Sequence, residues 1–245
     1  MGFDIAAIRA ALMDDALPIR ALDTVDSTNT ECRRALAAGE TRCLVLADAQ
    51  SAGRGRMGRS FHSPAGSGLY MSLLFRPAAG AADAVGVTTF AAAATAESIE
   101  ELTGLSCGIK WVNDLYLNGK KVCGILTEGV GAAVIVGIGV NLTPAPMPAE
   151  IAHIAGCLGR GDIRDALAGR IAAALLRYRP GDSGHMDAYR RRSIILGRRV
   201  RFTLNGRPLK GRAAAVGDGG ELLVDTAEGR VALCSGEISL DEIEW

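Results

Sequence analysis

The sequence predicts an α+β protein in which helices flank a sheet and a small β-barrel follows at the C-terminal end. The prediction rests on a change of pattern along the chain. Up to residue 194, short apolar runs typical of strands alternate with longer segments whose apolar residues recur at helical spacing. After residue 195 the helical spacing ends, and short apolar runs are separated by turn signals such as Asn205-Gly206 and Glu228-Gly229. We therefore expect two domains, residues 1–194 and residues 195–245.

The predicted helices are recognised by apolar periodicity and by the residues at their ends. The second helix follows Asp26-Ser27-Thr28-Asn29, whose side chains can accept hydrogen bonds from the first backbone N–H groups, and it stops at Gly39. The third is alanine-rich and is expected to pack under the sheet, and Pro180-Gly181 separates the last two. In order, the predicted helices are residues 3–13, 30–38, 83–102, 163–178 and 186–193.

The predicted strands are short apolar runs bounded by turn residues. Pro77 ends one of them because proline lacks the backbone donor that a strand needs, and Asn118-Gly119 marks a hairpin turn between two others. Small residues in the last run of the first domain would let another group approach its backbone closely. In order, the predicted strands are residues 21–25, 42–50, 69–76, 106–112, 114–117, 121–128 and 132–142, then 198–204, 208–216, 221–225, 230–234 and 237–239 in the barrel.

Composition excludes several classes of protein. The 245 residues are 49% hydrophobic and 22% charged, with 27 basic and 27 acidic side chains, so no overall charge favours DNA or an anionic membrane. The first residues lack the pattern of a secretory signal, and no apolar run reaches the roughly 20 residues of a membrane helix. Six cysteines without a C-x-x-C pair indicate reduced thiols. We expect a cytoplasmic protein that binds neither DNA nor a membrane.

The segment from Gly53 to Arg59 is the strongest candidate for a ligand site. It holds three glycines and three arginines between two predicted strands. Glycine lets a backbone approach a ligand closely, and arginine offers a permanent charge to phosphate or carboxylate. The segment spells G-x-G-x-x-G, but a dinucleotide site needs a helix to begin there, and residues 59–68 have no helical periodicity. A loop that closes over an anion and a solvated surface loop both remain open.

Two further segments carry polar residues at strand ends. In Lys110-Trp111-Val112-Asn113-Asp114, strand alternation would place Lys110 and Val112 on one face and Trp111 and Asn113 on the other, although a turn explains Asn-Asp equally well. In Gly137–Asn141, the polar Asn141 closes an apolar strand. The three histidines match no nucleophilic or metal-binding arrangement. Arginine, lysine and asparagine without a placed nucleophile suit phosphoryl or adenylyl transfer, in which the substrates supply the nucleophiles.

Together these segments resemble the biotin protein ligases, also called biotin-[acetyl-CoA-carboxylase] ligases. Five blocks occur in the order and spacing of that family, from about residue 22 to the C-terminus. The blocks are Asp26–Asn29, Gln50–Arg59 running into Ser63-Pro64 and Gly68–Ser72, Lys110–Asp114, Gly119–Leu126 with Glu128, and Gly137–Asn141. Two positions depart from the family pattern: Phe61 stands where a tryptophan is usual, and Val112 where a proline is usual.

The resemblance implies both a fold and a reaction. The fold is a mixed, largely antiparallel sheet flanked by helices, similar to the class II aminoacyl-tRNA synthetases, with a C-terminal SH3-like barrel. The reaction joins biotin and ATP into biotinyl-5′-AMP and then transfers the biotinyl group to a lysine of a biotin carboxyl carrier domain. ATP and Mg²⁺ are the implied cofactors, and biotin and the carrier domain are the implied partners. The oligomeric state is left open, a homodimer included.

The resemblance also assigns roles to individual residues. The expected biotin-binding residues are Ser27, Thr28, Asn29, Gln50, Arg54, Gly55, Arg56 and Lys121. The expected nucleotide-binding residues are Arg56, Arg59, Phe61, Asn113, Asp114 and Asn141, of which Asp114 would hold Mg²⁺. The expected catalytic residues are Arg56, Lys110 and Lys121.

Two other functions remain open at this stage. A lipoate ligase has a similar fold and also adenylates a carboxylate, although the Gly53–Arg59 and Lys110–Asp114 blocks favour biotin. A biotin-sensing binding protein without catalysis is the second. A biotin-sensing repressor would need a DNA-binding domain, and about 20 residues before the first strand are too few for one.

Overall fold

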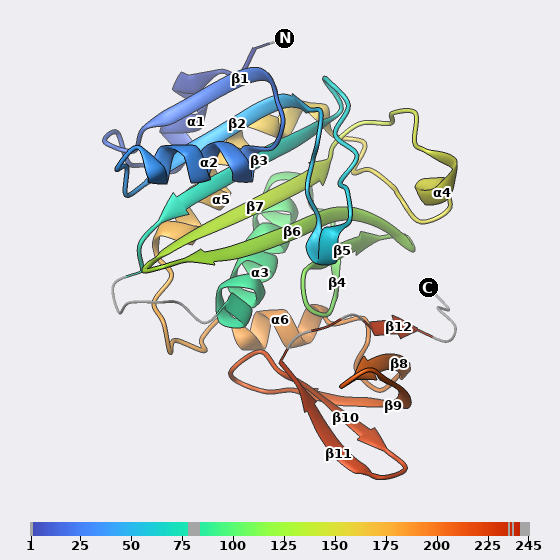
Figure 1. The fold of residues 1–245 in the computed structure, drawn as a ribbon. Coiled ribbons are helices and arrows are strands. Elements are labelled where there is room, and N and C mark those ends of the chain that lie inside the picture. Colours follow the sequence, from blue (N-terminus) through green and yellow to red (C-terminus); the bar gives the residue numbers. More distant parts are fainter. Residues whose placement is uncertain (1, 78–83, 235, 237, 241–245) are drawn as a thin grey trace.

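A seven-stranded mixed sheet organises the first part of the chain (Figure 1). The computed structural model describes residues 2–77, 84–234, 236 and 238–240. The strands follow the order β1-β2-β3-β7-β6-β5-β4, in which β1 and β2 are parallel and all other neighbours are antiparallel. The strands are β1 (Ile19–Val25), β2 (Cys43–Gln50), β3 (Gly68–Phe75), β4 (Gly108–Lys110), β5 (Asp114–Leu117), β6 (Lys120–Val130) and β7 (Ala133–Asn141). The predicted mixed, largely antiparallel sheet is confirmed.

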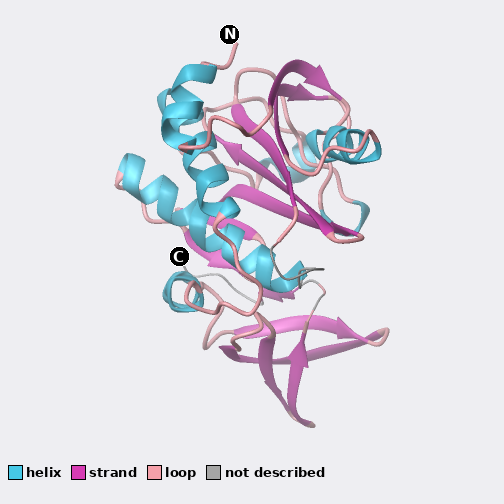
Figure 2. Cartoon of the chain, turned by 90° about the vertical axis from the view of Figure 1, so that its left-hand side faces the viewer, coloured by secondary structure: helices cyan, strands magenta, loops and turns pink. Residues whose placement is uncertain are grey.

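Helices cover the two faces of this sheet unequally. On one face lie α1, α3 and α5, while α2 lies against β2, β3 and β7 on the other (Figures 1 and 2). The helices are α1 (Ile5–Leu12), α2 (Thr28–Ala37), α3 (Ala84–Thr103), α4 (Ala149–Ala152), α5 (Arg164–Leu176) and α6 (Met186–Arg192), with short 3-10 turns at Arg56–Gly58 and Gly161–Ile163. None of the described helices is long and apolar enough to cross a membrane.

Strand alternation explains the two apolar layers. On β2, Leu44 and Leu46 join the large core under α1, α3 and α5, whereas Cys43 and Val45 join the small cluster under α2. On β7, the even-numbered residues 134–140 face the large core. The odd-numbered face of β7 begins with Ala133 and Ile135 under α2 and continues with glycines. One end of this face therefore lies beyond the helix and carries little side-chain volume.

A five-stranded antiparallel sheet forms the C-terminal part, as the turn signals predict. Its strands follow the order β11-β10-β9-β8-β12. They are β8 (Arg199–Leu204), β9 (Arg207–Val216), β10 (Leu222–Thr226), β11 (Gly229–Leu233) and β12 (Ile238–Leu240). Val200, Phe202 and Val224 belong to the same apolar cluster as the core of the first sheet, so the two sheets share one core. The domain boundary at residue 194 stays a prediction.

Several predicted elements differ from the structure. Strand β4 ends at Lys110, earlier than the predicted residue 112, and residues 111–113 form a turn. Of the two interpretations of this segment, the turn is therefore confirmed and the strand alternation is wrong, and Trp111 and Val112 are both buried. The Trp111–Val112 peptide bond is cis. Helix α2 begins at Thr28, two residues before its predicted start, and α4 was not predicted. Asp83 and Glu237, at the starts of a predicted helix and a predicted strand, lie outside the described residues.

All six cysteines are free thiols, as predicted. Four of them, Cys32, Cys43, Cys107 and Cys123, are buried. Burial raises the pKa of Cys107 to about 11, so this thiol stays protonated at neutral pH.

A close approach between α1 and α5 gives a test of the core. Gly169 on α5 faces α1 so closely that a Cβ there would lie 2.4 Å from the Ile8 carbonyl oxygen and 2.7 Å from the Ala11 Cβ. We expect Gly169→Ala to push the helices apart and lower the free energy of unfolding by about 1–3 kcal/mol. Gly129→Ala is the control because no atom lies within 4 Å of the added Cβ. Urea denaturation of both variants checks this, and equal stability would contradict it.

Candidate active site

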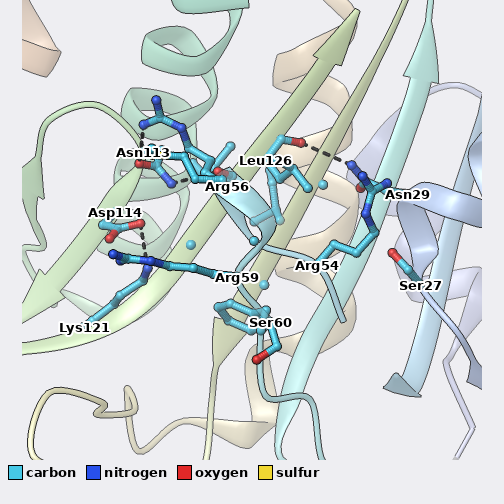
Figure 3. A pocket seen from close by; sticks show the side chains of 18 of the residues that line it. Ser27, Asn29, Arg54, Arg56, Arg59, Ser60, Asn113, Asp114, Lys121 and Leu126 are labelled. Carbon is cyan, nitrogen blue, oxygen red and sulfur yellow. Dashed lines mark hydrogen bonds and ion pairs between the residues drawn. The ribbon is translucent and has the colours of Figure 1, made fainter. Parts of the chain in front are cut away.

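A pocket opens on the face of the sheet that α2 leaves uncovered (Figure 3). The space between its walls is about 930 Å³, including its open mouth. Its walls come from α2, the Gly53–Arg59 loop, the turn after β4, and strands β6 and β7. Gly236 and Ile238 add a contribution from the C-terminal sheet.

The floor of the pocket consists of glycines on neighbouring strands. Gly124 on β6 pairs directly with Gly139 on β7, and Gly137 is two residues away on the same face. The Phe61 ring lies on this floor, because a Cβ on Gly139 would be 2.4–3.0 Å from three ring carbons and a Cβ on Gly124 would be 3.1 Å from a fourth. The prediction that small residues on β7 allow a close approach is thus confirmed, and the group that approaches is Phe61.

One end of the pocket is lined by uncharged polar groups. Thr28 begins α2, and its backbone N–H donates to Gln50 Oε1 at 2.9 Å, so Gln50 satisfies one of the unpaired donors at the helix start. The Ser27 side chain makes no capping hydrogen bond, contrary to the capping prediction for this residue. Buried Ser72 places its Oγ 2.7 Å from Thr28 Oγ1 and 2.6 Å from Asn29 Oδ1.

Glu128 on β6 stands directly behind this polar end. Its carboxylate accepts hydrogen bonds from Asn29 Nδ2 and from an Arg33 guanidinium nitrogen, both at 2.8 Å. Arg54 lies beside the same carboxylate, with one guanidinium nitrogen 3.1 Å away. Burial acts to raise the pKa of Glu128, but the hydrogen bonds from Arg33 and Asn29, with the charges of Arg33 and Arg54, outweigh burial and hold the pKa below its ordinary value. Glu128 is therefore ionised at neutral pH.

The glycine-arginine loop folds into a small hairpin over the pocket. Arg54 and Ser60 form an isolated antiparallel bridge, and the Gly55 N–H donates to the Arg59 carbonyl at 2.7 Å. A 3-10 turn at the tip places Met57 and Gly58 at positive φ, and the Met57 side chain is 74% exposed. The predicted loop between two strands is confirmed, and it has regular internal hydrogen bonds.

Arg56 connects three parts of the chain across the pocket mouth. Its guanidinium donates to Asn113 Oδ1 at 3.0 Å and to the Gly236 carbonyl at 3.1 Å. The Asn113 side chain is in turn anchored to strand β6, because its Nδ2 donates to the Ile125 carbonyl at 2.9 Å. The loop, the turn after β4 and the C-terminal sheet therefore meet at one arginine.

Two lysines and a carboxylate face the other end of the pocket. Lys110 ends β4, Asp114 begins β5, and Lys121 lies on β6. Lys121 Nζ is 2.7 Å from Asp114 Oδ1. Arg59 extends from the loop toward this pair (Figure 3). The pocket therefore gathers lysine and arginine at this end, opposite an end where uncharged polar groups lie beside the ion pair of Arg54 and Glu128. This arrangement suits a ligand with one uncharged and one anionic end.

The carboxylates of the pocket fit Mg²⁺ only as a companion of a bound phosphate. Among the described residues that line the pocket, Asp114 is the one with an acidic side chain. The described residues also contain no group of three or more His, Cys, Asp or Glu that could hold a metal by itself. Mg²⁺ is commonly held by one or two carboxylates together with substrate phosphates, so a single Asp114 is compatible with that mode. When bound, Mg²⁺ would neutralise charge on the phosphates.

Comparison with known proteins identifies the family of the chain. Residues 21–142 match the biotin/lipoate A/B protein ligase family, and residues 195–241 match the biotin protein ligase C terminal domain. A biotin--[acetyl-CoA-carboxylase] ligase of Mycobacterium tuberculosis is 30% identical over 253 residues, which cover 96% of this chain and 94% of that protein. The chain belongs to the biotin/lipoate A/B protein ligase family.

Two further members illustrate the likeness. The structure of the biotin protein ligase from Aquifex aeolicus in complex with biotin and ATP is similar with a TM-score of 0.78 and 28% identity, covering 94% of this chain and 100% of that one. The bifunctional ligase/repressor BirA of Bacillus subtilis is 39% identical over 215 residues, 80% of this chain. The chain spans 66% of that relative, just under two thirds of its length.

Within this family fold, the structure brings together nearly all residues that the sequence singled out. The described lining includes Ser27, Thr28, Asn29, Gln50, Arg54, Gly55, Arg56, Arg59, Phe61, Lys110, Asn113, Asp114 and Lys121. Asn141 is not part of it, because its side chain donates to the Gly156 carbonyl at 2.8 Å and anchors a later loop. The roles of the predicted site residues in binding biotin and the nucleotide stay predictions.

Some residues of the site had no assigned role at the sequence level. Ser72 and Glu128 were present in the matching blocks, but nothing in their local sequence distinguishes them from surface or core positions. Trp111 lines the pocket and donates from its indole nitrogen to the Gly220 carbonyl at 2.9 Å. Gly236 and Ile238 could not have been found, since they lie far along the chain in a different sheet.

The lowered pKa of Glu128 predicts a pH effect on stability. A carboxyl whose folded pKa lies below its unfolded value of about 4.5 contributes stability above that pH and loses it as the pH falls through the folded pKa. We expect Glu128→Gln to reduce the unfolding free energy at pH 7 and to narrow its difference from wild type below pH 4. Urea titrations at pH 7.0 and 3.5 check this. A constant difference at both pH values would show that the ionised carboxylate is not responsible.

Proposed function

We propose that this protein is an ATP-dependent ligase that converts biotin to biotinyl-5′-AMP and transfers the biotinyl group to a lysine of a biotin carboxyl carrier domain. One observation carries the proposal. A single pocket holds a neutral polar end at Ser27–Asn29, a glycine floor, and an opposite end rich in lysine and arginine. The family of the chain, and its similarity to a ligase solved with biotin and ATP, support the assignment.

In the first step, the biotin carboxylate attacks the α-phosphorus of ATP. A carboxyl oxygen–phosphorus bond forms, the bond from the α-phosphorus to the bridging oxygen breaks, and pyrophosphate leaves with the electron pair. Bringing two anions together requires fixed positive charge, which Lys110, Lys121, Arg56 and Arg59 supply. We assign Lys121 to the biotin carboxyl oxygen and Lys110 to the α-phosphate.

Lys121 is held by Asp114, and Arg56 by Asn113. Both cations are therefore already positioned in the pocket, so less side-chain freedom is lost when the anions bind. When Lys121 binds the biotin carboxyl group in place of Asp114, the Asp114 carboxylate becomes available to Mg²⁺ in our proposal. We place Asn113 and Phe61 beside the nucleotide.

In the second step, a lysine amine of the carrier attacks the carbonyl carbon of the adenylate, and AMP leaves. The adenylate must survive until the amine arrives, although water hydrolyses it. The hairpin from Arg54 to Ser60 covers the pocket, and Arg56 ties its tip to Asn113 and Gly236. We assign this hairpin the role of excluding water. The proposal includes a cytoplasmic location and allows a homodimer.

The hairpin role predicts the behaviour of Arg56→Gly. The fold is expected to remain intact, because Arg56 lies on a loop outside the apolar core, while biotinyl-5′-AMP escapes and labels lysines of unrelated proteins. The rate of release into a filtrate and biotin incorporation into serum albumin measure this. Arg207→Gly, an exposed arginine paired with Glu228, is the control. Retention of the adenylate as in wild type would refute a covering role for the loop.

The charge of Lys121 is predicted to act in the first step. We expect Lys121→Gln to lower the rate of ATP–pyrophosphate exchange by about 10²–10³, the usual cost of removing one donor to developing charge. Lys120→Gln is a matched control, because Lys120 is the adjacent residue and its Nζ donates to the His153 carbonyl outside the pocket lining. An equal loss in both variants would exclude a specific role for Lys121.

The overall proposal is tested with the purified protein, biotin, MgATP and a biotin carboxyl carrier domain. We expect the carrier to gain the mass of one biotinyl group. ATP–pyrophosphate exchange with lipoic acid in place of biotin separates a lipoate ligase, and biotin binding without exchange would identify a non-catalytic sensor.

A further inference from the structure

A carboxylate outside the pocket lining joins three segments of the chain that meet at the pocket. Glu128 has a side chain that is 12% exposed. It accepts hydrogen bonds from Asn29 and Arg33 on α2. Arg54, at the base of the hairpin, places its two terminal nitrogens 3.2 and 3.1 Å from the two carboxylate oxygens. Figure 3 shows Asn29 and Arg54 next to each other at this end of the pocket.

Two acceptors on β6 turn the Asn29 amide nitrogen toward that strand: the Glu128 carboxylate at 2.8 Å and, at the longer distance of 3.4 Å, the Leu126 carbonyl. An ionised carboxylate only accepts hydrogen bonds, so the amide nitrogen turns to it and the amide oxygen turns away. That oxygen faces Ser72, whose Oγ lies 2.6 Å from it. Strand β7 fits closely around the same oxygen, because a Cβ on Gly137 would lie 2.0 Å from it. The amide therefore has one orientation.

This orientation extends through a chain of buried polar groups. The Ser72 hydroxyl, beside Asn29 Oδ1, is also 2.7 Å from Thr28 Oγ1. Because the one Ser72 proton goes to Asn29, the Thr28 hydroxyl supplies the proton of its contact with Ser72, and Gln50 Oε1 accepts from the Thr28 backbone N–H at 2.9 Å. Gln50 Nε2 in turn donates to Ser63 Oγ at 2.8 Å. The order of donors and acceptors from Asn29 to Ser63 is thus fixed at one end by the charge of Glu128.

We propose that Glu128 is a positioning residue that makes the pocket selective for an acid with a ureido ring over an acid whose ring lacks N–H groups. The inference rests on the proposed function and deepens it. A ureido group has N–H donors and a C=O acceptor in fixed places, so it needs partners in a matching order. A ring without them gains nothing from that order. Through Arg54, the same carboxylate also holds the hairpin base against α2.

The test compares kinetic constants in ATP–pyrophosphate exchange, with biotin and lipoic acid as probes. Glu128→Gln keeps the size of the side chain and removes its charge. We expect the KM for biotin to rise at least tenfold, while the KM for ATP stays within twofold and kcat within threefold. The preference for biotin over lipoic acid falls by a similar factor. The control is Glu31→Gln on α2, the helix that also carries Asn29. The Glu31 carboxylate pairs with Arg34, and the change is expected to alter none of these values.

A pair of variants separates positioning from a structural role. Asn29→Asp places two carboxylates against each other and is expected to raise the KM for biotin more than tenfold. Combining it with Glu128→Gln restores a donor and an acceptor with exchanged roles, so the double variant is expected to recover at least tenfold of that loss. A purely structural contribution would make the double variant worse than either single one.

Several results would overturn the inference. They are an unchanged KM for biotin in Glu128→Gln, a parallel rise in the constants for biotin and ATP, or no recovery in the double variant. If Glu128→Gln fails to fold, the inference is decided by whether the double variant recovers the KM for biotin that Asn29→Asp loses. If the wild type catalyses ATP–pyrophosphate exchange and Glu128→Gln has the same KM for biotin as the wild type, only this inference fails and the proposed function stands. If the wild type neither binds biotin in calorimetry nor supports exchange, the proposed function fails and the inference falls with it.

Discussion

The pocket depends on a patch of sheet that carries almost no side chains. Gly124 and Gly139 pair across β6 and β7, and Gly137 follows on the same face. On an ordinary sheet, larger residues at these positions would fill the space with core side chains. Here the pleat leaves room for Phe61 from the loop and for the amide of Asn29 from α2. Elements far apart in the chain can reach one surface only because that surface is bare.

Around this bare patch, charge is arranged so that every buried or half-buried carboxylate meets a cation. Glu128 contacts Arg33 and Arg54, and Asp114 contacts Lys121. Taking a charge out of water is costly unless it is paired, so these contacts stabilise the site. They also hold Arg54 and Lys121 in place along the pocket wall.

The C-terminal sheet takes part in the same site. It shares the apolar core of the first sheet, and Trp111 and Arg56 donate to the carbonyls of Gly220 and Gly236. Ile238 adds an apolar contact at the pocket wall. A hairpin also held at its tip, here through the Gly236 carbonyl just before β12, has less conformational freedom than a loop fixed only at its base. The small sheet thus contributes to the pocket as well as to the core.

The sequence by itself determined the local features. Apolar periodicity and turn residues predicted the strands and most helices, because both depend on neighbours within a few residues, and the order of the five blocks predicted the family. The sequence left strand and turn equally open for Asn113-Asp114, since the contact that fixes Asn113 is with Ile125 on another strand. Only the tertiary structure decided the register that aligns Gly124 with Gly139, the contact of Glu128 with Asn29, and the contact of Arg56 with Gly236. These join residues that are distant in the chain, and strand pairing and packing, which local composition does not encode, bring them together.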